Sequence, residues 1–361
     1  MKPETIALHH GYEADNQHAV AVPIHQTTSF SFDNAQHGAD LFDLKVAGNI
    51  YSRIMNPTCA VLEQRIAALE GGIGALAVAS GMAAITYAIQ TISETGDNLV
   101  SISELYGGTY NLLAHTLPRQ GIETRFADKD DFAGIEALID DRTKVLYCES
   151  IGNPSGSVVD IKRLADIAHA AGIPLVVDNT VATPFLWRPI EQGADIVVHS
   201  ATKYMGGHGT TMGGVIVDSG TFPWADQPKR FALLNEPDVS YHGVSYTRDV
   251  GEAAFITRAR VVPLRNMGAV LSAQAAWNLL QGLETLALRI ERVCENTQKI
   301  AEYLQQHPRV SWVNYAGLPN HKDHALAQKY MKGKASGILS FGIEGGREAG
   351  ARFYDALALI L

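Results

Sequence analysis

Short apolar runs alternate with helix-like segments between residues 74 and 217. The runs are Ala75–Ala79, Leu99–Ser103, Val145–Cys148, Pro174–Val177, Asp195–Val198 and Gly214–Val217. The segments between them include Met82–Ile92 and Ile161–Ala171. Continuous apolar strands separated by helices predict a mostly parallel sheet that is covered on both faces. Because ligands collect beyond the carboxyl ends of such strands, the residues that follow each run are the first candidates for chemistry.

A different pattern begins at Leu279, where apolar residues recur at alternating steps of four and three. The stripe consists of Leu279, Leu283, Leu286, Ile290, Val293, Ile300 and Leu304, with the polar Thr297 inside it. This spacing predicts one long helix with one buried face, and it is too short for a coiled coil to be the better interpretation. The strand-like runs Val310–Val313 and Ile338–Ile343 follow, so we expect a smaller α+β region there.

Two further stretches lack a clear period. Residues Ser219–Arg260 are polar and rich in proline, glycine and aromatic residues, which favours an ordered excursion over the surface. Residues Gly71–Ser93 contain no charge, but they include several glycines and polar residues. Because a membrane span needs about 20 predominantly apolar residues, we interpret this second stretch as a buried strand that leads into a packed helix.

The 361 residues carry a formal net charge of −9, and 46% of them are hydrophobic. No cluster of lysine or arginine forms a basic face, which argues against nucleic acid and against an anionic membrane surface as partners. The cysteines Cys59, Cys148 and Cys294 are far apart and odd in number, so they predict neither a disulfide framework nor a metal site. The first residues lack the apolar core of a signal peptide. We therefore expect a soluble, cytoplasmic protein.

Two motifs favour ordinary roles over functional ones. Gly72–Ala77 fits the GxGxxA fingerprint of dinucleotide-binding proteins. However, the helix-like Val61–Leu69 precedes it and a strand follows, which reverses the required order and makes a nicotinamide-dependent dehydrogenase a weak alternative. His321 and His324 lie in a polar, charged stretch, and we interpret them as solvated rather than as metal ligands. No metal site is predicted.

The most informative segment begins at the end of the run Asp195–Val198, where Ser200, Thr202 and Lys203 follow. Hydroxyls can donate to a phosphate, while a lysine amine can form a Schiff base with an aldehyde. Asp178 stands at the end of another run, 25 residues earlier. A carboxylate there can pair with a protonated pyridine nitrogen, although helix capping is its ordinary role. One strand–helix–strand unit between the two positions would bring them to neighbouring strand ends.

Two more strand ends add to this pattern. Ser80, Gly81 and Met82 follow one strand and open a helix, whose free N–H groups and dipole suit a phosphate. Tyr106 follows another strand, where its ring can lie over a flat ligand. A phosphate site, an aldehyde-binding lysine, an acid for a pyridine nitrogen and a stacking aromatic ring together indicate a phosphorylated aromatic aldehyde. Pyridoxal 5′-phosphate (PLP) fits this description.

Five segments in the same order make the chain resemble the Cys/Met-metabolism family of PLP-dependent enzymes from Ile6 to its end. They are Tyr51–Pro57, Ser80–Met82, Tyr106–Gly108, Val177–Asn179 and Ser200–Lys203 with the glycines and His208 that follow. The resemblance implies an α/β protein of fold type I, similar to aspartate aminotransferase, with a mostly parallel sheet in a large domain and a smaller α+β C-terminal domain. The implied parts are an N-terminal arm (1–57) that contacts a neighbouring subunit, a PLP-binding large domain (58–278) and a small domain (279–361).

The resemblance also implies a role for each site residue. Lys203 would bind PLP covalently and act as general base, and Tyr106 would stack on the ring, so these two are the expected catalytic residues. Asp178 would pair with the ring nitrogen. The remaining expected contacts are Ser80, Gly81, Met82, Ser200 and Thr202 with the phosphate, Asn153 near the ring oxygen and the substrate, and Tyr51 and Arg53 with the phosphate of the neighbouring subunit. A dimer would then be the smallest active unit, and tetramers are usual in the family.

Within this family the chain resembles the O-acetylhomoserine sulfhydrylases, which make homocysteine and acetate from O-acetylhomoserine and sulfide in methionine biosynthesis. The long segment Asp218–Gly268 and the run Asp178–Pro184 carry this similarity. Methionine γ-lyases have a cysteine at the position of Gly108, and many lyases and cystathionine synthases have Ser-Asp in place of Gly209 and Thr210. Methionine γ-lyase and cystathionine γ-synthase or γ-lyase activity remain the alternatives. A related binding protein without catalysis is disfavoured by the presence of the lysine, aspartate and tyrosine.

The chain ends in the apolar run Asp355–Leu361, which has no turn residue. Members of the family continue past this point, and the resemblance implies that the continuation supplies an arginine for the α-carboxylate of the substrate. The small domain therefore looks incomplete. We expect a protein of only these residues to bind PLP covalently, to turn over poorly and to aggregate. The alternative is that these residues are part of a longer, active chain.

Overall fold

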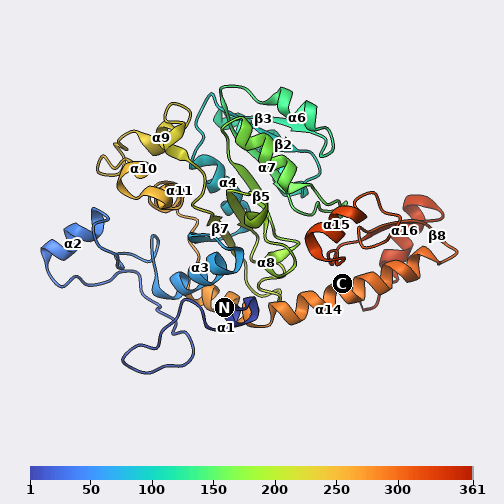
Figure 1. Ribbon diagram of the computed structural model, residues 1–361. Helices are drawn as coiled ribbons and strands as arrows, with labels where there is room; N and C mark the ends of the chain where they lie inside the picture. Colours follow the sequence, from blue (N-terminus) through green and yellow to red (C-terminus); the bar gives the residue numbers. More distant parts are fainter. Residues whose placement is uncertain (360–361) are drawn as a thin grey trace.

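A seven-stranded sheet lies at the centre of the molecule in the computed structural model, which describes residues 1–359 (Figure 1). Its strands are β1 (Gly74–Val78), β2 (Asn98–Ile102), β3 (Glu123–Ala127), β4 (Thr143–Glu149), β5 (Leu175–Asp178), β6 (Ile196–His199) and β7 (Gly214–Asp218). They lie side by side in the order β1-β7-β6-β5-β4-β2-β3. All neighbouring pairs are parallel except those of β7, which runs antiparallel to β1 and β6. The mostly parallel sheet predicted from the apolar runs is confirmed.

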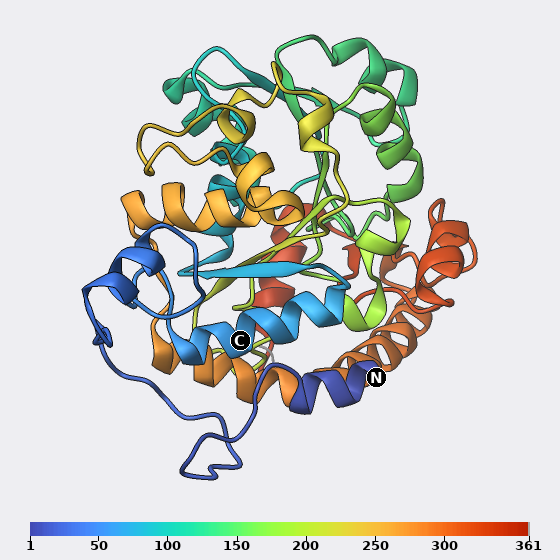
Figure 2. The same cartoon turned by 60° about the vertical axis from the view of Figure 1, so that its left-hand side comes forward.

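Helices cover both faces of this sheet (Figure 2). The helices on one face include α3 (Pro57–Glu70), α7 (Ile161–Ala170) and α13 (Ala273–Glu284), and those on the other include α4 (Gly81–Gln90) and α11 (Ala254–Ala259). Along β4, the buried Leu146 and Cys148 belong to the first of two hydrophobic cores, and the buried Val145 and Tyr147 belong to the second. Burial on both faces explains why the strands are continuous apolar runs in the sequence.

The N-terminal residues include α1 (Pro3–His9), which packs against α3, and α2 (Ala35–Phe42). Between these two helices the chain forms a long loop that reaches away from the rest of the molecule (Figures 1 and 2). The other short helices are α5 (Gly107–Asn111), α6 (Phe132–Leu138), α8 (Thr183–Leu186), α9 (Ala232–Asn235), α10 (Tyr246–Asp249) and α12 (Arg265–Met267).

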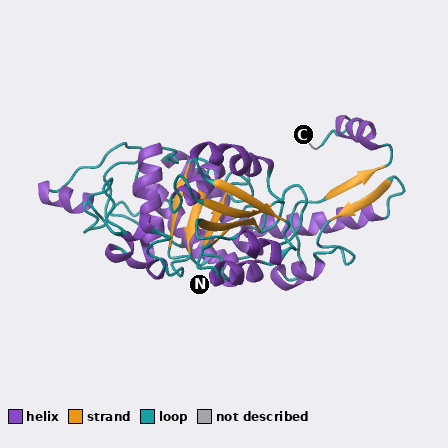
Figure 3. Cartoon of the chain, turned by 90° about the horizontal axis from the view of Figure 1, so that it is seen from above, coloured by secondary structure: helices purple, strands orange, loops and turns teal. Residues whose placement is uncertain are grey.

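A second, two-stranded antiparallel sheet lies at one end of the molecule, apart from the central sheet (Figure 3). It consists of β8 (Val310–Asn314) and β9 (Ser340–Ile343), and α14 (Leu286–Gln305), α15 (His324–Met331) and α16 (Gly346–Asp355) accompany it. The expected α+β region is therefore present. The domain limits drawn at residues 57, 278 and 361 and the incompleteness of the last domain stay predictions. Of the apolar C-terminal run, Ile360 and Leu361 lie outside the described residues.

The prediction of one long helix from Leu279 onwards is wrong, because the stripe is divided between α13 and α14. The chain leaves the helix at Thr285, whose φ of −109° and ψ of 5° are not helical. The guanidinium of Arg289 donates to the carbonyl of Gly282 at 2.6 Å. In a continuous helix that carbonyl would accept from the N–H four residues later. Leu279, Leu283, Leu286 and Ile290 remain in one core, so the apolar spacing alone does not reveal the break.

The segment Ser219–Arg260 is ordered, but describing it as a surface excursion is wrong. Its aromatic side chains Phe222, Trp224, Phe231, Tyr246 and Phe255 are all buried in the second core. The indole of Trp224 stacks on the ring of Phe255 with a centroid distance of 5.7 Å. The segment lacks a period because it folds into several short helices that bury single aromatic residues.

The uncharged stretch Gly71–Ser93 contains β1 and α4, as predicted. None of the helices within residues 1–359 has both the length and the apolar character needed to cross a membrane. The strand β3 was not predicted, since its residues are partly polar and only half-buried at the edge of the sheet.

Candidate active site

A cavity of about 540 Å³ lies where β4, β5 and β6 end and α4 begins. Nine of the eleven residues singled out in the sequence line it: Ser80, Gly81, Met82, Tyr106, Asn153, Asp178, Ser200, Thr202 and Lys203. They come from separate parts of the chain, and the parallel strands bring them to one edge of the sheet. The individual roles expected for these residues stay predictions, but their common location is a property of the structure.

Tyr51 and Arg53 lie outside this cavity. The guanidinium of Arg53 is 5.5 Å from the ring centroid of Tyr51, and its Nη1 donates to the carbonyl of Arg265. The Tyr51 side chain is 40% exposed. A role in the cavity of a neighbouring subunit stays a prediction.

The N-terminus of α4 forms one wall of the cavity. Ser80 caps the helix, since its hydroxyl accepts from the N–H of Ala83 at 3.2 Å. A Cβ on Gly81 would lie 2.6 Å from the Cβ of Ser200, so only glycine lets the helix end approach the end of β6 this closely. The N–H groups of the first helical turn need acceptors from outside the helix, and a phosphate is well suited to this position.

The loop that carries Lys203 is held by hydrogen bonds on both sides. The N–H of Ser200 donates to Thr180 Oγ1 at 2.7 Å, and the N–H of Lys203 donates to the carbonyl of Ser200 at 3.1 Å. Thr202 Oγ1 accepts from the N–H of Gly213 at 3.0 Å and donates to the carbonyl of the same residue at 3.2 Å. The Thr202 hydroxyl proton is thus already in use, so a phosphate contact through it would compete with this pair.

Two carboxyl groups stand side by side on the floor of the cavity. Glu149 and Asp178 are Cα partners on the neighbouring strands β4 and β5. Asp178 Oδ1 accepts from the N–H of Thr180 at 2.9 Å, and Glu149 Oε1 accepts from the N–H of Tyr106 at 2.7 Å. Burial raises the pKa of Asp178, and its hydrogen bonds with Thr180 oppose this shift. Burial and the neighbouring charge of Asp178 raise the pKa of Glu149 well above its usual range.

Glu149 and Thr180 also line the cavity and are not among the site residues predicted from the sequence. Glu149 directly follows the apolar run Val145–Cys148, so the rule that selected Asp178, to inspect the residue after each run, would also have found it. Thr180 could have been noticed beside Asp178. The C-terminal part adds Ile338 to the cavity wall, and nothing in its local sequence indicates this.

The interpretation of His321 as a solvated residue is wrong. Its side chain is half-buried and contacts Asn314 Oδ1 through Nε2 at 2.6 Å. His324 is also half-buried, with Nδ1 3.0 Å from the carbonyl oxygen of Ala316. Within the described part of the chain, no three histidine, cysteine or acidic side chains gather in a way that could hold a metal ion.

Comparisons with known proteins agree with this geometry. A model of the family described as Cys/Met metabolism PLP-dependent enzyme matches residues 4–361. A protein of Schizosaccharomyces pombe named homocysteine synthase is 51% identical over 99% of this chain and 83% of its own length. A Thermus thermophilus protein named O-acetyl-L-homoserine sulfhydrylase 1 is 50% identical over 100% of this chain and 86% of its own.

One similar crystal structure comes from Campylobacter jejuni and is described as a putative O-acetylhomoserine (thiol)-lyase with N′-pyridoxyl-lysine-5′-monophosphate. It superposes with a TM-score of 0.96 at 43% identity and covers 100% of this chain and 90% of its own. The modified residue in that structure is a lysine that carries the cofactor.

Proposed function

Because the chain belongs to the family of Cys/Met metabolism PLP-dependent enzymes, we propose that it converts O-acetylhomoserine and sulfide to homocysteine and acetate. The observation that carries this proposal is the cavity in which Lys203, Asp178 and Tyr106 meet at strand and helix ends. Two relatives that share about half of their residues with the chain have names that refer to this reaction.

The residues present fit PLP. Because Gly81 has no side chain, the start of α4 lies close to Ser200 at the cavity wall. A phosphate can bind there to the N-terminus of the helix. At the opposite end, the carboxyl groups of Asp178 and Glu149 are buried together, and within residues 1–359 neither forms an ion pair with a lysine or arginine. A protonated ring nitrogen would supply the positive charge that this pair of carboxyl groups lacks.

When bound, PLP supplies an electron sink for the carbons next to the substrate amine. Asp178 would hold the proton on the ring nitrogen, and Tyr106 would keep the ring in place from one side. Lys203 Nζ would hold the cofactor between turnovers, remove the Cα proton of the substrate and return it later. Overall, the C–O bond at Cγ of O-acetylhomoserine breaks, acetate leaves with the bonding electrons, and sulfide forms the C–S bond.

Gly108 is a position at which this chain differs from the methionine γ-lyases. The ring of Tyr106 lies over Gly108, and a Cβ there would be 2.5 Å from the Cε1 atom of the ring. A cysteine at this position, which the γ-lyases carry, would therefore displace the Tyr106 ring from the place where it faces the cavity.

Both products can be measured on one preparation of the protein to test the proposal. With sulfide present, we expect homocysteine to form from O-acetylhomoserine much faster than methanethiol forms from methionine. The opposite ratio would identify a γ-lyase and reject the proposal. A faster reaction with O-succinylhomoserine or O-phosphohomoserine would show that this ester, and not the acetyl ester, is the preferred substrate.

We also propose that the protein is a homo-oligomer, at least a dimer and, as is usual in the family, a tetramer. We further propose that it acts in the cytoplasm. The exposed Tyr51 outside the cavity supports the first statement. The three cysteines are free and buried, which is typical of proteins in a reducing compartment. Sedimentation analysis would test the oligomer, since a monomer that is fully active would contradict it.

A further inference from the structure

The segment 151–158 carries Asn153 into the wall of the cavity, and Ile151 lies beside it. Two backbone hydrogen bonds shape this segment: the N–H of Gly152 donates to the carbonyl of Ser157 at 2.9 Å, and the N–H of Gly156 donates to the carbonyl of Gly152 at 2.7 Å. Ile151 and Asn153 of this segment thus line the cavity, whereas Ser155 and Val158 form hydrogen bonds with the C-terminal part of the chain.

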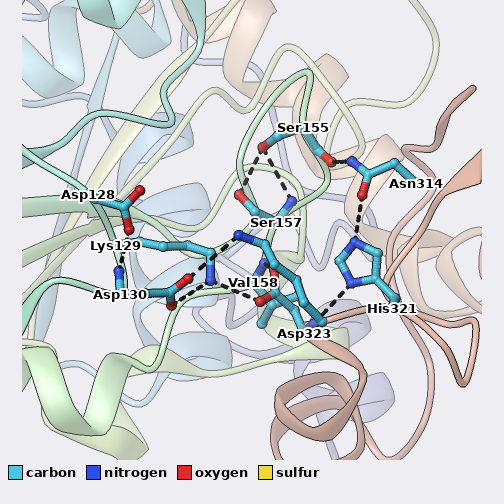
Figure 4. A network of polar contacts seen from close by, with 10 residues as sticks. Asp128, Lys129, Asp130, Ser155, Ser157, Val158, Asn314, His321 and Asp323 are labelled. Atoms are coloured by element: carbon cyan, nitrogen blue, oxygen red, sulfur yellow. Dashed lines mark hydrogen bonds and ion pairs between the residues drawn. The ribbon is translucent and has the colours of Figure 1, made fainter.

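Asp323 is the central residue of this hydrogen-bond network (Figure 4). Its side chain is buried, and Oδ2 accepts from the N–H of Val158 at 3.0 Å. Its Oδ1 accepts from Lys129 Nζ at 2.8 Å, and the same Nζ also donates to Asp130 at 2.8 Å. Lys129 is only 1% exposed. Buried charges are costly unless they are paired and hydrogen-bonded, and here both conditions hold.

A second contact starts from Asn314, the last residue of β8 (Figure 4). Its Nδ2 donates to the carbonyl of Ser155, and its Oδ1 contacts His321 Nε2 at 2.6 Å. His321 Nδ1 in turn accepts from the N–H of Asp323 at 3.0 Å. Asn314, His321 and Asp323 therefore form one connected unit that holds the segment at two points, Ser155 and Val158.

We propose that Asp323 and Asn314 are positioning residues for Asn153, through which the C-terminal part of the chain sets the geometry of the cavity. The proposal rests on the proposed function only in that Asn153 is taken to contact bound PLP or substrate. Both anchored residues lie close behind Asn153, Ser155 inside the same turn and Val158 just after it, so a shift of either contact moves the turn that carries this cavity residue. Lys129 serves this unit by neutralising Asp323 in the buried setting.

The test is a double-mutant cycle between Asp323→Asn and Asn153→Ala, read out by PLP affinity, the pH dependence of the visible PLP band, and KM against kcat. If Asp323 acts through Asn153, Asp323→Asn should lower the PLP affinity or raise KM by about tenfold. In the Asn153→Ala background the same substitution should change PLP affinity and KM very little. The matched control is the exposed ion pair of Lys162 and Asp166 on α7, where Asp166→Asn should leave all three readouts unchanged.

Asn314→Ala serves as a second variant if Asp323→Asn does not fold, because it removes the contact with Ser155 without leaving a buried charge unpaired. It should shift the same readouts in the same direction. A loss of thermal stability with unchanged PLP affinity, band and KM would overturn the proposal and leave the network a structural one, as would full additivity with Asn153→Ala. PLP affinity and the band do not require sulfhydrylase activity, so a failure of the proposed reaction would be recognised separately.

Discussion

Asp178 and Asp218 are locally similar residues in different settings. Both end a strand, and each accepts the N–H of the residue two positions later at 2.9 Å, Thr180 for Asp178 and Gly220 for Asp218. Burial raises the pKa of Asp178, and it raises the pKa of Asp218 to about 7. Because β7 runs antiparallel to β6, Asp218 is at the opposite edge of the sheet, away from the cavity. Only Asp178 can therefore contact a ligand there.

Asp178→Asn should reduce kcat by at least about tenfold, since a loss of one pKa unit of stabilisation on the ring nitrogen is worth about 1.4 kcal/mol. The free energy of unfolding of this variant should change by less than this amount, because the amide also relieves the repulsion between Asp178 and Glu149. Steady-state kinetics and urea unfolding measure the two effects. Asp218→Asn is the matched control and should alter stability without changing kcat. Near-normal turnover in Asp178→Asn would show that this carboxylate serves only the turn.

His321 predicts an acid dependence of stability. Its Nδ1 accepts a hydrogen bond and so carries no proton, and burial lowers the pKa of the ring, as do the charges of Lys322, Lys129 and His324, whereas Asp323 opposes them. The unfolded chain therefore binds the proton first as the pH falls. The free energy of unfolding should drop below pH about 6.5, by at most about 1.4 kcal/mol per pH unit, until the folded pKa is reached.

His321→Gln should flatten this acid limb in urea unfolding at several pH values, because glutamine does not titrate. His9→Gln is the control, because His9 is exposed in α1 and is not among the groups that act on the His321 ring, and it should keep the slope of the unaltered protein. An unchanged slope in His321→Gln would mean that another group titrates there.

Site residues could be predicted from the sequence where they follow an apolar run, because ligands collect beyond the carboxyl ends of parallel strands. Lys203 and Asp178 were found because each follows an apolar run, and Glu149 obeys the same rule. His321 could not be interpreted in this way, since its environment depends on Asn314 and on the distant Ser155, which only the folded chain brings together.

At the scale of elements, the start of α4 combines a structural cap with a binding position. Ser80 and Ser272 are both N-caps whose hydroxyl accepts the N–H three residues later at 3.2 Å, Ser80 for α4 and Ser272 for α13. Ser80 lines the cavity, whereas Ser272 does not. The same substitution at the two positions therefore separates the energy of capping from the energy of binding.

Ser80→Ala and Ser272→Ala should each lower the free energy of unfolding by about 1 kcal/mol, the usual value of an N-cap side chain. Only Ser80→Ala should also weaken the binding of PLP, measured by titration of the apoprotein. Equal PLP affinity in the two variants would show that the Ser80 hydroxyl does not contribute to the binding of the phosphate.

Element boundaries show how far the apolar pattern reaches. Six of the sheet strands were visible as runs because both of their faces are buried, which leaves no polar positions to interrupt them. The edge strand β3 lacks this signal. At the break, Arg289 donates to the carbonyl of Gly282, and its guanidinium also donates to the carbonyl of Tyr204 at 2.6 Å, next to Lys203. Such a contact between distant positions leaves no periodic trace.

At the scale of the whole molecule, the arrangement of the arm suggests that one chain does not complete the site alone. Tyr51 and Arg53 lie apart from the cavity of their own chain, near Arg265. If they serve a second copy, each site of a symmetric dimer combines Lys203 of one chain with Arg53 of the other. Two variants that are inactive alone would then complement each other.

We expect Lys203→Ala to abolish covalent PLP and turnover, and Arg53→Ala to lose most activity while keeping Lys203 intact. When the two chains are refolded together in equal amounts, half of the dimers are mixed, and each mixed dimer has one site with both residues and one with neither. The mixture should therefore recover about a quarter of the activity of the unaltered protein. Refolding each variant with itself is the control and should give no gain over the activity of that variant alone. An absence of recovery, with mixed dimers confirmed by mass, would place Arg53 in the site of its own chain or outside any site.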